Sequence, residues 1–175
     1  MPATRLLPHQ QEHEHPPVEP ATLRRVCGLF ATGVTVITTG VGGPPAGTTV
    51  NSFTSVSLEP PLVLFCLHHK SRLQAELRAS RAFAVNVLAQ PQQEVARAFA
   101  GRKTADFETV PHRRAELGLP VLTEAMAHLV CRVVDQYPGG DHSIVLGKVV
   151  ATSALAPRPD PLVFFDGAMG AAPPE

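Results

Sequence analysis

The chain has 175 residues, with 15 basic and 15 acidic side chains and an isoelectric point near 7.1. This length favours one domain with a substantial core. The balanced charge leaves no basic stripe for nucleic acid, and no apolar run approaches the roughly 20 residues of a membrane span. Because the start of the chain also lacks the apolar core of a signal peptide, we expect a cytoplasmic protein.

Three cysteines, Cys27, Cys66 and Cys131, are an odd number without metal-type spacing. All three lie in apolar runs, so we expect small buried hydrophobic residues in a reducing compartment and no metal site.

Residues 1–20 contain five prolines, no aromatic residue and three histidines, His9, His13 and His15. This composition predicts a disordered N-terminal tail, since it offers too little apolar surface to offset the entropy of ordering; metal binding by the histidines is the alternative. We predict one folded domain over residues 21–168 and a short C-terminal tail over residues 169–175.

The first predicted element is a helix that packs on the body of the protein, because Leu23, Val26, Cys27 and Phe30 share one helical face. Seven strands are then expected, at residues 34–39, 46–51, 62–67, 83–89, 127–137, 142–155 and 161–166. Two more helices are predicted, over residues 72–79 with Ser71 as the cap and over residues 92–100. The connection from Gly101 to Val121 is long and polar, which is typical of a functional or mobile loop.

Strands joined mostly by short turns, with few helices between them, argue against a doubly wound parallel sheet. The chain also lacks the glycine patterns of a Rossmann site and of a P-loop. We therefore predict a mainly β protein, an antiparallel β-barrel with peripheral helices.

The most informative segment lies between two apolar strands and packs six hydroxyl groups and one amide into ten positions: Thr48, Thr49, Asn51, Ser52, Thr54, Ser55 and Ser57. Each such group left buried without a partner would cost about 1–3 kcal/mol. A flat, polar, uncharged ligand such as the ring of a flavin would satisfy them. The alternative is a loop whose hydroxyls bind backbone and water.

The chain resembles the flavin reductase-like family with an FMN-binding split barrel, over about residues 22–167. The matching stretches are residues 30–39, residues 47–61 with Glu59-Pro60-Pro61 at their end, Ser71 with Leu77 and Ser80, residues 83–88, residues 99–101, Gly140-Asp141-His142 followed by residues 144–149, and residues 161–165.

This resemblance implies a split β-barrel of Greek-key type that uses NADH or NADPH to reduce FMN or FAD. Reduced flavin would then pass to a partner monooxygenase, and the protein would be a homodimer. Two other functions stay open: a flavin carrier or interaction module without reductase activity, and a related flavin-dependent oxidase.

The resemblance also implies which residues bind the cofactor. The flavin-binding candidates are Thr49, Val50, Asn51, Ser52, Ser55, Cys66, Leu67 and Phe99, with Val50 where the family often has Ala. Ser71 and Arg72 open a helix beside Lys70, and backbone N–H groups, a hydroxyl and two cations suit a flavin phosphate. Arg102 and Lys103 are further candidates for a flavin or nicotinamide phosphate. Phe165 is a candidate for stacking near the cofactors, with core packing as the alternative.

His142 is the candidate catalytic residue. It follows a tight glycine turn and opens a strand, which by itself is typical of an ordinary polar turn residue. The resemblance places it on the nicotinamide side of the flavin. Hydride transfer between the two rings needs alignment rather than a protein acid, so His142 is expected to position nicotinamide. Where the family often continues with Gly-Arg/Lys-Tyr, residues 167–170 contain neither a cation nor a tyrosine.

Overall fold

The computed structural model describes residues 16–101 and 107–171. Its helices are α1 (Pro20–Gly28), α2 (Leu73–Ser80) and α3 (Gln93–Ala100). Its strands are β1 (Thr32–Gly33), β2 (Thr35–Thr39), β3 (Ala46–Val50), β4 (Thr54–Leu58), β5 (Pro61–His68), β6 (Ala82–Val87), β7 (His112–Arg114), β8 (Pro120–Leu122), β9 (Ala127–Gly139), β10 (His142–Ala154), β11 (Leu162–Phe165) and β12 (Ala168–Ala171). The mainly β fold predicted from the sequence is confirmed.

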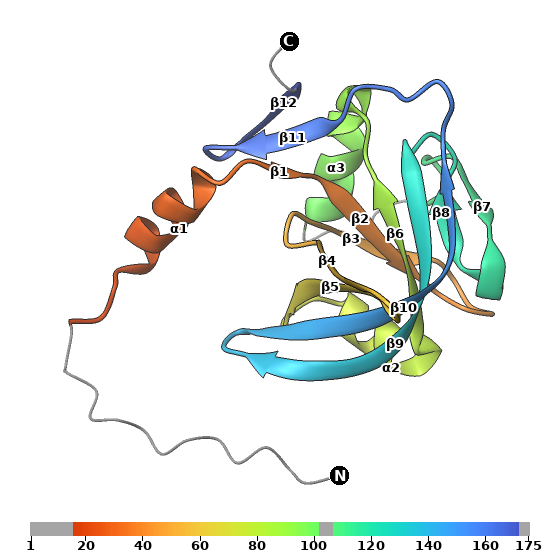
Figure 1. Ribbon diagram of the computed structural model, residues 1–175, viewed down its shortest axis with the longest axis horizontal. Coiled ribbons are helices and arrows are strands. Elements are labelled where there is room, and N and C mark those ends of the chain that lie inside the picture. The colour runs from red at the N-terminus through yellow and green to blue at the C-terminus, as the bar shows by residue number, and fades with distance from the viewer. Residues whose placement is uncertain (1–15, 102–106, 172–175) are drawn as a thin grey trace, which may run out of the picture.

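The main sheet has seven antiparallel strands in the order β3-β2-β6-β9-β10-β5-β4. It curls so that its two ends approach each other, with β3 in contact with β5 (Figure 1). Since β3 and β4 are consecutive in the chain, residues 51–53 connect the two ends of the sheet; we call them the bridging segment. The other described strands form a three-stranded sheet, β1-β11-β12, and the β7–β8 pair.

The core fills the inside of the curled sheet. The strand sequence TVITT of β2 is rich in β-branched residues, and all five are buried. Phe65 and Phe83 meet edge to face with ring centroids 5.0 Å apart, and α2 covers this core with Leu73 and Leu77. A second cluster lies under α3, around the rings of Phe99 and Phe107.

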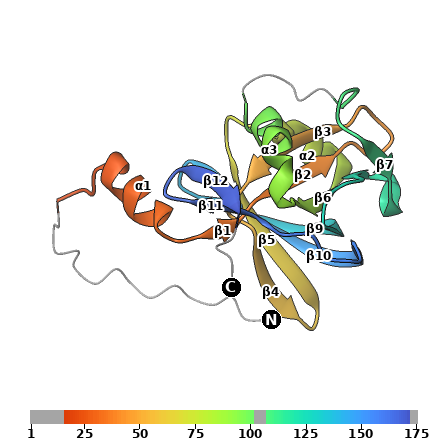
Figure 2. The same ribbon diagram turned by 90° about the horizontal axis from the view of Figure 1, so that it is seen from above.

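The predicted packing of the first helix on the barrel is wrong for this chain. None of the residues of α1 is buried, and Leu23 and Val26 are each more than half exposed. Figure 2 shows α1 standing apart from the main sheet, and the β4–β5 hairpin also extends from the body. The helix is held at its end, where the Asp166 N–H donates to the carbonyl of Gly28 at 2.8 Å. The periodicity predicted the apolar face of α1 correctly, but it did not show that this face is exposed in the single chain.

The cysteines were expected to be buried, and they differ from one another. Cys131 is buried, and burial raises the pKa of its thiol to about 12. Cys66 is half-buried, while Cys27 is exposed on α1, so the prediction is wrong for Cys27.

The polar connection predicted between Gly101 and Val121 contains β7 and most of β8, and the segment before β5 forms the strand β4. Arg114 holds β7 in place because its guanidinium donates to the carbonyls of Gly40, Gly43 and Gly118. At the C-terminal end, β12 pairs with β11 as far as Ala171, so the expected boundary after residue 168 falls within a strand. Most of the expected N-terminal tail, residues 1–15, lies outside the described residues.

Candidate functional site

The bridging segment is fixed to β5 by the hydroxyl of Ser52. Its Oγ accepts a hydrogen bond from the Cys66 N–H at 3.0 Å and donates to the Cys66 carbonyl at 3.3 Å. The hydroxyl thus spans the gap between the two ends of the main sheet. Ser52 therefore fixes the course of the backbone there, although an oxygen that already makes two bonds has little capacity left for a ligand.

The hydroxyl of Thr49 also binds backbone, since Oγ1 donates to the Ala96 carbonyl of α3 at 2.7 Å. For Thr49 and Ser52 the backbone alternative considered from the sequence is therefore correct. Asn51 and Ser55 differ from these two residues. Both are exposed, and within the described residues no hydrogen bond involves either side chain. Asn51 and Ser55 therefore have hydrogen-bonding groups that can bind a flat uncharged ligand.

Leu67 and Val50 contribute mainly to packing. The Leu67 side chain is buried, so this residue can reach a cofactor only through its backbone, and Val50 packs against the same core. The Leu67 carbonyl accepts from Nε2 of Gln74 at 3.2 Å. The Oε1 atom of Gln74 is buried without a partner among the described residues, which leaves one acceptor unsatisfied beside β5.

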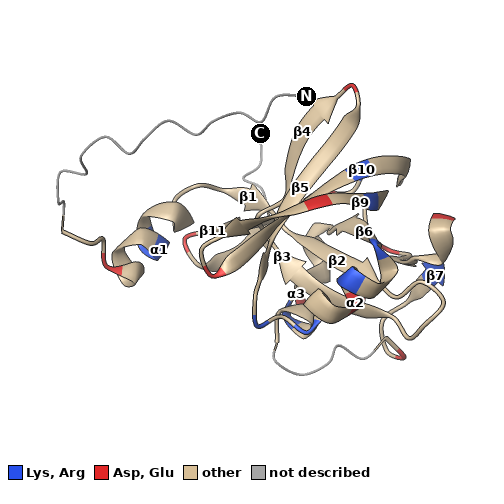
Figure 3. Cartoon of the chain, turned by 90° about the horizontal axis from the view of Figure 1, so that it is seen from below, with Lys and Arg blue, Asp and Glu red and all other residues tan. Residues whose placement is uncertain are grey.

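The predicted phosphate site lies directly after β5. Ser71 precedes α2, and its Oγ accepts from the Leu73 N–H at 3.3 Å, so its own proton is available to donate to an anion. The exposed side chains of Lys70 and Arg72 flank it. Figure 3 shows Lys and Arg spread over α1, α2, α3 and β7, so these two supply local rather than widespread positive charge.

His142 lies at the start of β10, directly across from His68 at the end of β5. Their rings meet edge to face with centroids 4.9 Å apart. Asp141 lies between them, with Oδ1 2.7 Å from His142 Nδ1 and Oδ2 3.7 Å from His68 Nε2. The His142 hydrogen bond, the largest cause, and the charges of both imidazoles hold the pKa of Asp141 below its usual range.

These contacts define which ring nitrogens are available. Because an ionised carboxylate only accepts, His142 donates through Nδ1 and leaves Nε2 for a ligand. The Lys70 N–H donates to Nδ1 of His68 at 2.9 Å, so a neutral His68 carries its proton on Nε2, toward Asp141. Within the described residues, no group of three or more His, Cys, Asp or Glu side chains is arranged to hold a metal ion.

His68 is not among the candidate residues named from the sequence, whereas the structure makes it the partner of His142. Alternation along β5 identifies a strand, but the facing strand is 74 positions further along the chain. A hydrogen-bonded register between residues this far apart leaves no local pattern in the sequence.

Four predicted residues lie away from this cluster or outside the described residues. The ring of Phe99 is almost fully buried against Phe107 and above Gly47, so the structure gives it a packing role. Phe165 is half exposed in the three-stranded sheet, a different sheet from the bridging segment. Lys103, with Arg102, lies outside the described residues.

Several of the other predicted residues are brought together along β5. Ser52 binds Cys66 of this strand, His142 faces His68 at its end, and Ser71 follows. This arrangement joins groups for a neutral polar ring, for an anion and for a second ring beside His142. Dinucleotide and flavin ligands have this combination of parts.

The chain belongs to the flavin reductase-like family. The family model described as a flavin reductase like domain matches residues 27–173. The fold and the family predicted from the sequence are thereby confirmed.

Individual relatives are similar over most of their length. The chain is 40% identical over 159 residues to the reductase subunit HsaB of a flavin-dependent monooxygenase from Mycobacterium tuberculosis, covering 90% of this chain and 85% of that protein. It is 44% identical over 156 residues to an NADH-dependent FAD reductase from Streptomyces globisporus, covering 86% and 85%. The structure of the NADH:FAD oxidoreductase SgcE6 from Streptomyces globisporus, in complex with NAD and FAD fragments, superposes with a TM-score of 0.84 at 42% identity, covering 92% of this chain and 99% of that one.

Proposed function

We propose that this protein is an NADH-dependent flavin reductase that supplies reduced flavin to a partner monooxygenase. The observation that carries this proposal is the alignment along β5 of the bridging segment, the start of α2 and His142 in a chain of this family. NADH is the proposed reductant because relatives at 37–44% identity are named NADH-dependent reductases. The flavin is FAD or FMN. The cytoplasmic location stays a prediction; none of the helices in the described parts of the chain is long and apolar enough to cross a membrane.

The described residues fit a flavin in three respects. Asn51 and Ser55 have unused hydrogen-bonding groups for the polar edge of the ring. Ser52 and Thr49 hold the backbone that presents these groups. Ser71 offers a hydroxyl proton to a phosphate, with Lys70 and Arg72 as cations beside it. The bound flavin would supply the redox chemistry by accepting a hydride from nicotinamide.

His142 is proposed to position nicotinamide. Asp141 fixes its ring through Nδ1, so Nε2 has one orientation for a ligand group. A ring held in this way contributes alignment, which is the main protein contribution to a hydride transfer. The lowered pKa of Asp141 means that its carboxylate is ionised near neutral pH, so it accepts the hydrogen bond that His142 donates.

Anaerobic stopped-flow mixing of the protein, FAD and NADH tests the reductase function directly. We expect the visible absorption band of the flavin to bleach at a rate that depends on enzyme concentration, and FMN and NADPH in separate runs define the preferences. A carrier would bind FAD and show no bleaching with NADH above the rate without enzyme. That result would overturn the reductase proposal.

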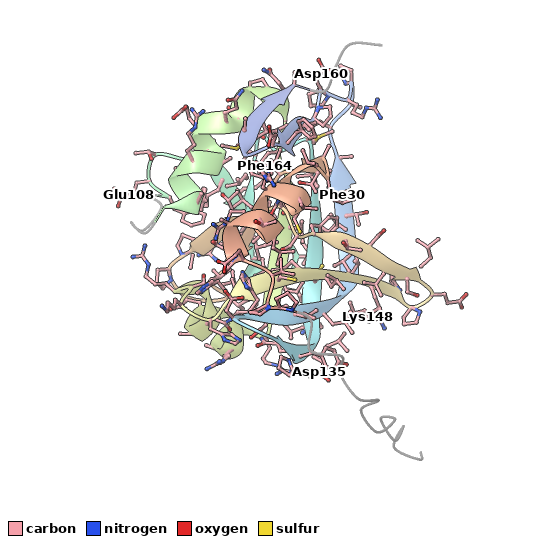
Figure 4. The ribbon with its side chains drawn as sticks, turned by 90° about the vertical axis from the view of Figure 1, so that its left-hand side faces the viewer. Phe30, Glu108, Asp135, Lys148, Asp160 and Phe164 are labelled. Atoms are coloured by element: carbon pink, nitrogen blue, oxygen red, sulfur yellow. The ribbon has the colours of Figure 1, made fainter. Side chains whose placement is uncertain are left out.

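We further propose that the protein is a homodimer. The apolar residues on and just after α1 are each more than half exposed: Leu23, Val26, Leu29 and Phe30. Figure 4 faces α1 and labels Phe30 just beyond its end. Val56 and Leu58 on the extended β4–β5 hairpin are also exposed. A second copy would cover these surfaces, which water contacts in the single chain.

Light scattering at micromolar concentration tests the dimer. We expect twice the chain mass for the wild type and a shift toward the monomer for Leu23→Glu with Val26→Glu. Val134→Glu, at an exposed apolar position on β9, is the matched control and should not change the mass. A fully active wild type with the mass of one chain would contradict the proposal.

A further inference from the structure

A cavity of about 160 Å³ lies at the opposite end of the β9–β10 hairpin from His142. It is formed by β7, β8, the start of β9 and the end of β10, on the right of Figure 1, whereas the hairpin turn lies at lower left. His142 and Ser153 are 11 positions apart on β10, up to roughly 35 Å along an extended strand. The cavity is therefore separate from the candidate flavin and nicotinamide site.

Four hydrogen-bonding side chains line this cavity, from Arg113, Thr123, His128 and Ser153. His128 and Ser153 face each other across β9 and β10. Within the described residues no hydrogen bond involves any of these four side chains. The cavity lining contains no Asp or Glu, so the groups that converge on it are one cation, one imidazole and two hydroxyls. This set suits an oxyanion.

His128 is the least expected member of the set. It is only 8% exposed, and its ring nitrogens make no hydrogen bond within the described residues but still reach solvent. Burial, the largest cause, and the charge of Arg113 lower the pKa of His128, while Glu116 acts in the opposite direction. The flavin and nicotinamide site does not use this residue. A ligand that accepted hydrogen bonds from His128 and Arg113 would replace solvent at both side chains.

The rest of the lining is apolar and comes from Leu122, Ala125, Ala154 and Leu155. In size the cavity resembles an engineered cavity of about 150 Å³ that holds benzene. Leu122 and Ala125 are buried, so Leu155, which is 45% exposed, is the apolar residue that a bare inorganic oxyanion would leave in contact with water. A small organic acid would contact Leu155 as well as the polar groups.

The geometry points to a second ligand site, for a small organic acid whose carboxylate binds Arg113 and His128 and whose carbon body lies against Leu122 and Leu155. This inference does not depend on the reductase function. The carboxylate would accept from the guanidinium and the imidazole, with the hydroxyls of Thr123 and Ser153 as further donors.

Isothermal titration calorimetry with benzoate tests the site, on the full chain with and without saturating FAD. We expect saturable binding whose affinity is the same in both conditions. Benzyl alcohol has the same ring without the charge and should bind at least tenfold more weakly. Binding should also weaken as the pH rises from 6 to 8, by up to about tenfold for each unit by which the anion raises the pKa of His128. Arg113 and Glu116 are the charged groups that act on this imidazole in the free protein.

Two variants assign the site. Arg113→Gln should weaken benzoate binding about tenfold, because a charge-assisted hydrogen bond is lost, while NADH-dependent flavin reduction continues at the wild-type rate. His128→Gln should remove the dependence on pH. Arg132→Gln is the matched control, since Arg132 is exposed on the same strand as His128 and does not line the cavity.

Several results would overturn the inference: no saturable binding of benzoate, equal affinity for benzyl alcohol, unchanged affinity in Arg113→Gln, or competition between benzoate and FAD. Inorganic phosphate that bound as tightly as benzoate would overturn the assignment to an organic acid. Since activity is measured in parallel, failure of this site and failure of the reductase function would give different results.

Discussion

Two polar regions of the main sheet differ in how much of their hydrogen-bonding capacity the protein itself uses. In the first, Asn86 and Thr38 are fully buried between β2, β6 and β8. Asn86 Nδ2 donates to the Val36 carbonyl at 2.9 Å and to Thr38 Oγ1 at 3.1 Å, and Asn86 Oδ1 accepts from the Leu122 N–H at 2.8 Å. Thr38 in turn donates to the Pro120 carbonyl. We call these groups the inner polar network.

The second region is the bridging segment with Ser55 after it. Asn51 is exposed, and its amide makes no hydrogen bond within the described residues, although it has the same donors and acceptors as Asn86. The same side chain therefore has opposite uses at the two positions. Where burial makes an unpaired group costly the protein satisfies it, and where the ends of the sheet meet, exposed side chains make no hydrogen bond within the described residues.

The largest expected effect is at the inner polar network. Asn86→Leu leaves the Leu122 N–H buried without a partner and removes the side-chain hydrogen bonds to the Val36 carbonyl and to Thr38, so the free energy of unfolding should fall by about 3 kcal/mol. Urea denaturation measures this loss. Asn51→Leu is the matched control and should change stability by less than about 0.5 kcal/mol. Equal stability of the two variants would contradict the proposed difference between the inner polar network and the bridging segment.

The next effect concerns the end of β5. His142→Ala should raise the KM for NADH or slow flavin reduction by up to about 10²-fold, because misaligned nicotinamide loses its near-attack geometry. FAD affinity, measured by fluorescence quenching, should stay nearly unchanged. His69→Ala alters an exposed neighbour of His68 and should leave both quantities at wild-type values. Joint loss of FAD affinity and thermal stability in His142→Ala would instead indicate a structural histidine.

An intermediate effect is expected near the start of β3. A Cβ at Gly47 would lie 2.7 Å from Cε1 of Phe99, so Gly47→Ala should destabilise the protein by about 1–3 kcal/mol through overpacking. Thermal unfolding measures this change, and adding Phe99→Leu should recover part of it. Gly43→Ala meets nothing within 4 Å and serves as the control. No recovery of stability in the double variant would mean that the Phe99 ring does not limit the size of the side chain at position 47.

The smallest effect on binding is expected at the bridging segment. Asn51→Ala should weaken FAD binding by about 1 kcal/mol, roughly fivefold, because one side-chain hydrogen bond to the flavin is lost while stability is kept. Ser52→Ala should also lower stability, since the Cys66 N–H loses its partner. Thr152→Ala removes an exposed hydroxyl from β10 and is the control for both. Unchanged FAD affinity in Asn51→Ala and Ser52→Ala would place the ligand elsewhere.

Much of the fold could be predicted because the residues of each strand are by themselves typical of a strand. The β-branched run of β2 and the long apolar strands β9 and β10 mark themselves by composition and alternation, and Ser71 precedes a helix as expected. The crowding of hydroxyls before β5 also identified the region where the ends of the sheet meet. Such patterns depend on neighbours a few positions apart, and the order of residues determines them directly.

The tertiary structure alone decided which of those residues act together. It paired His68 with His142. It also bound the hydroxyls of Thr49 and Ser52 to backbone groups, and it left α1 without a covering partner in the single chain. It also brought β7, β8 and the far end of the β9–β10 hairpin around the cavity beside His128. These outcomes depend on strand register and packing between residues far apart in the chain, and a local pattern shows which face is apolar without showing what that face meets.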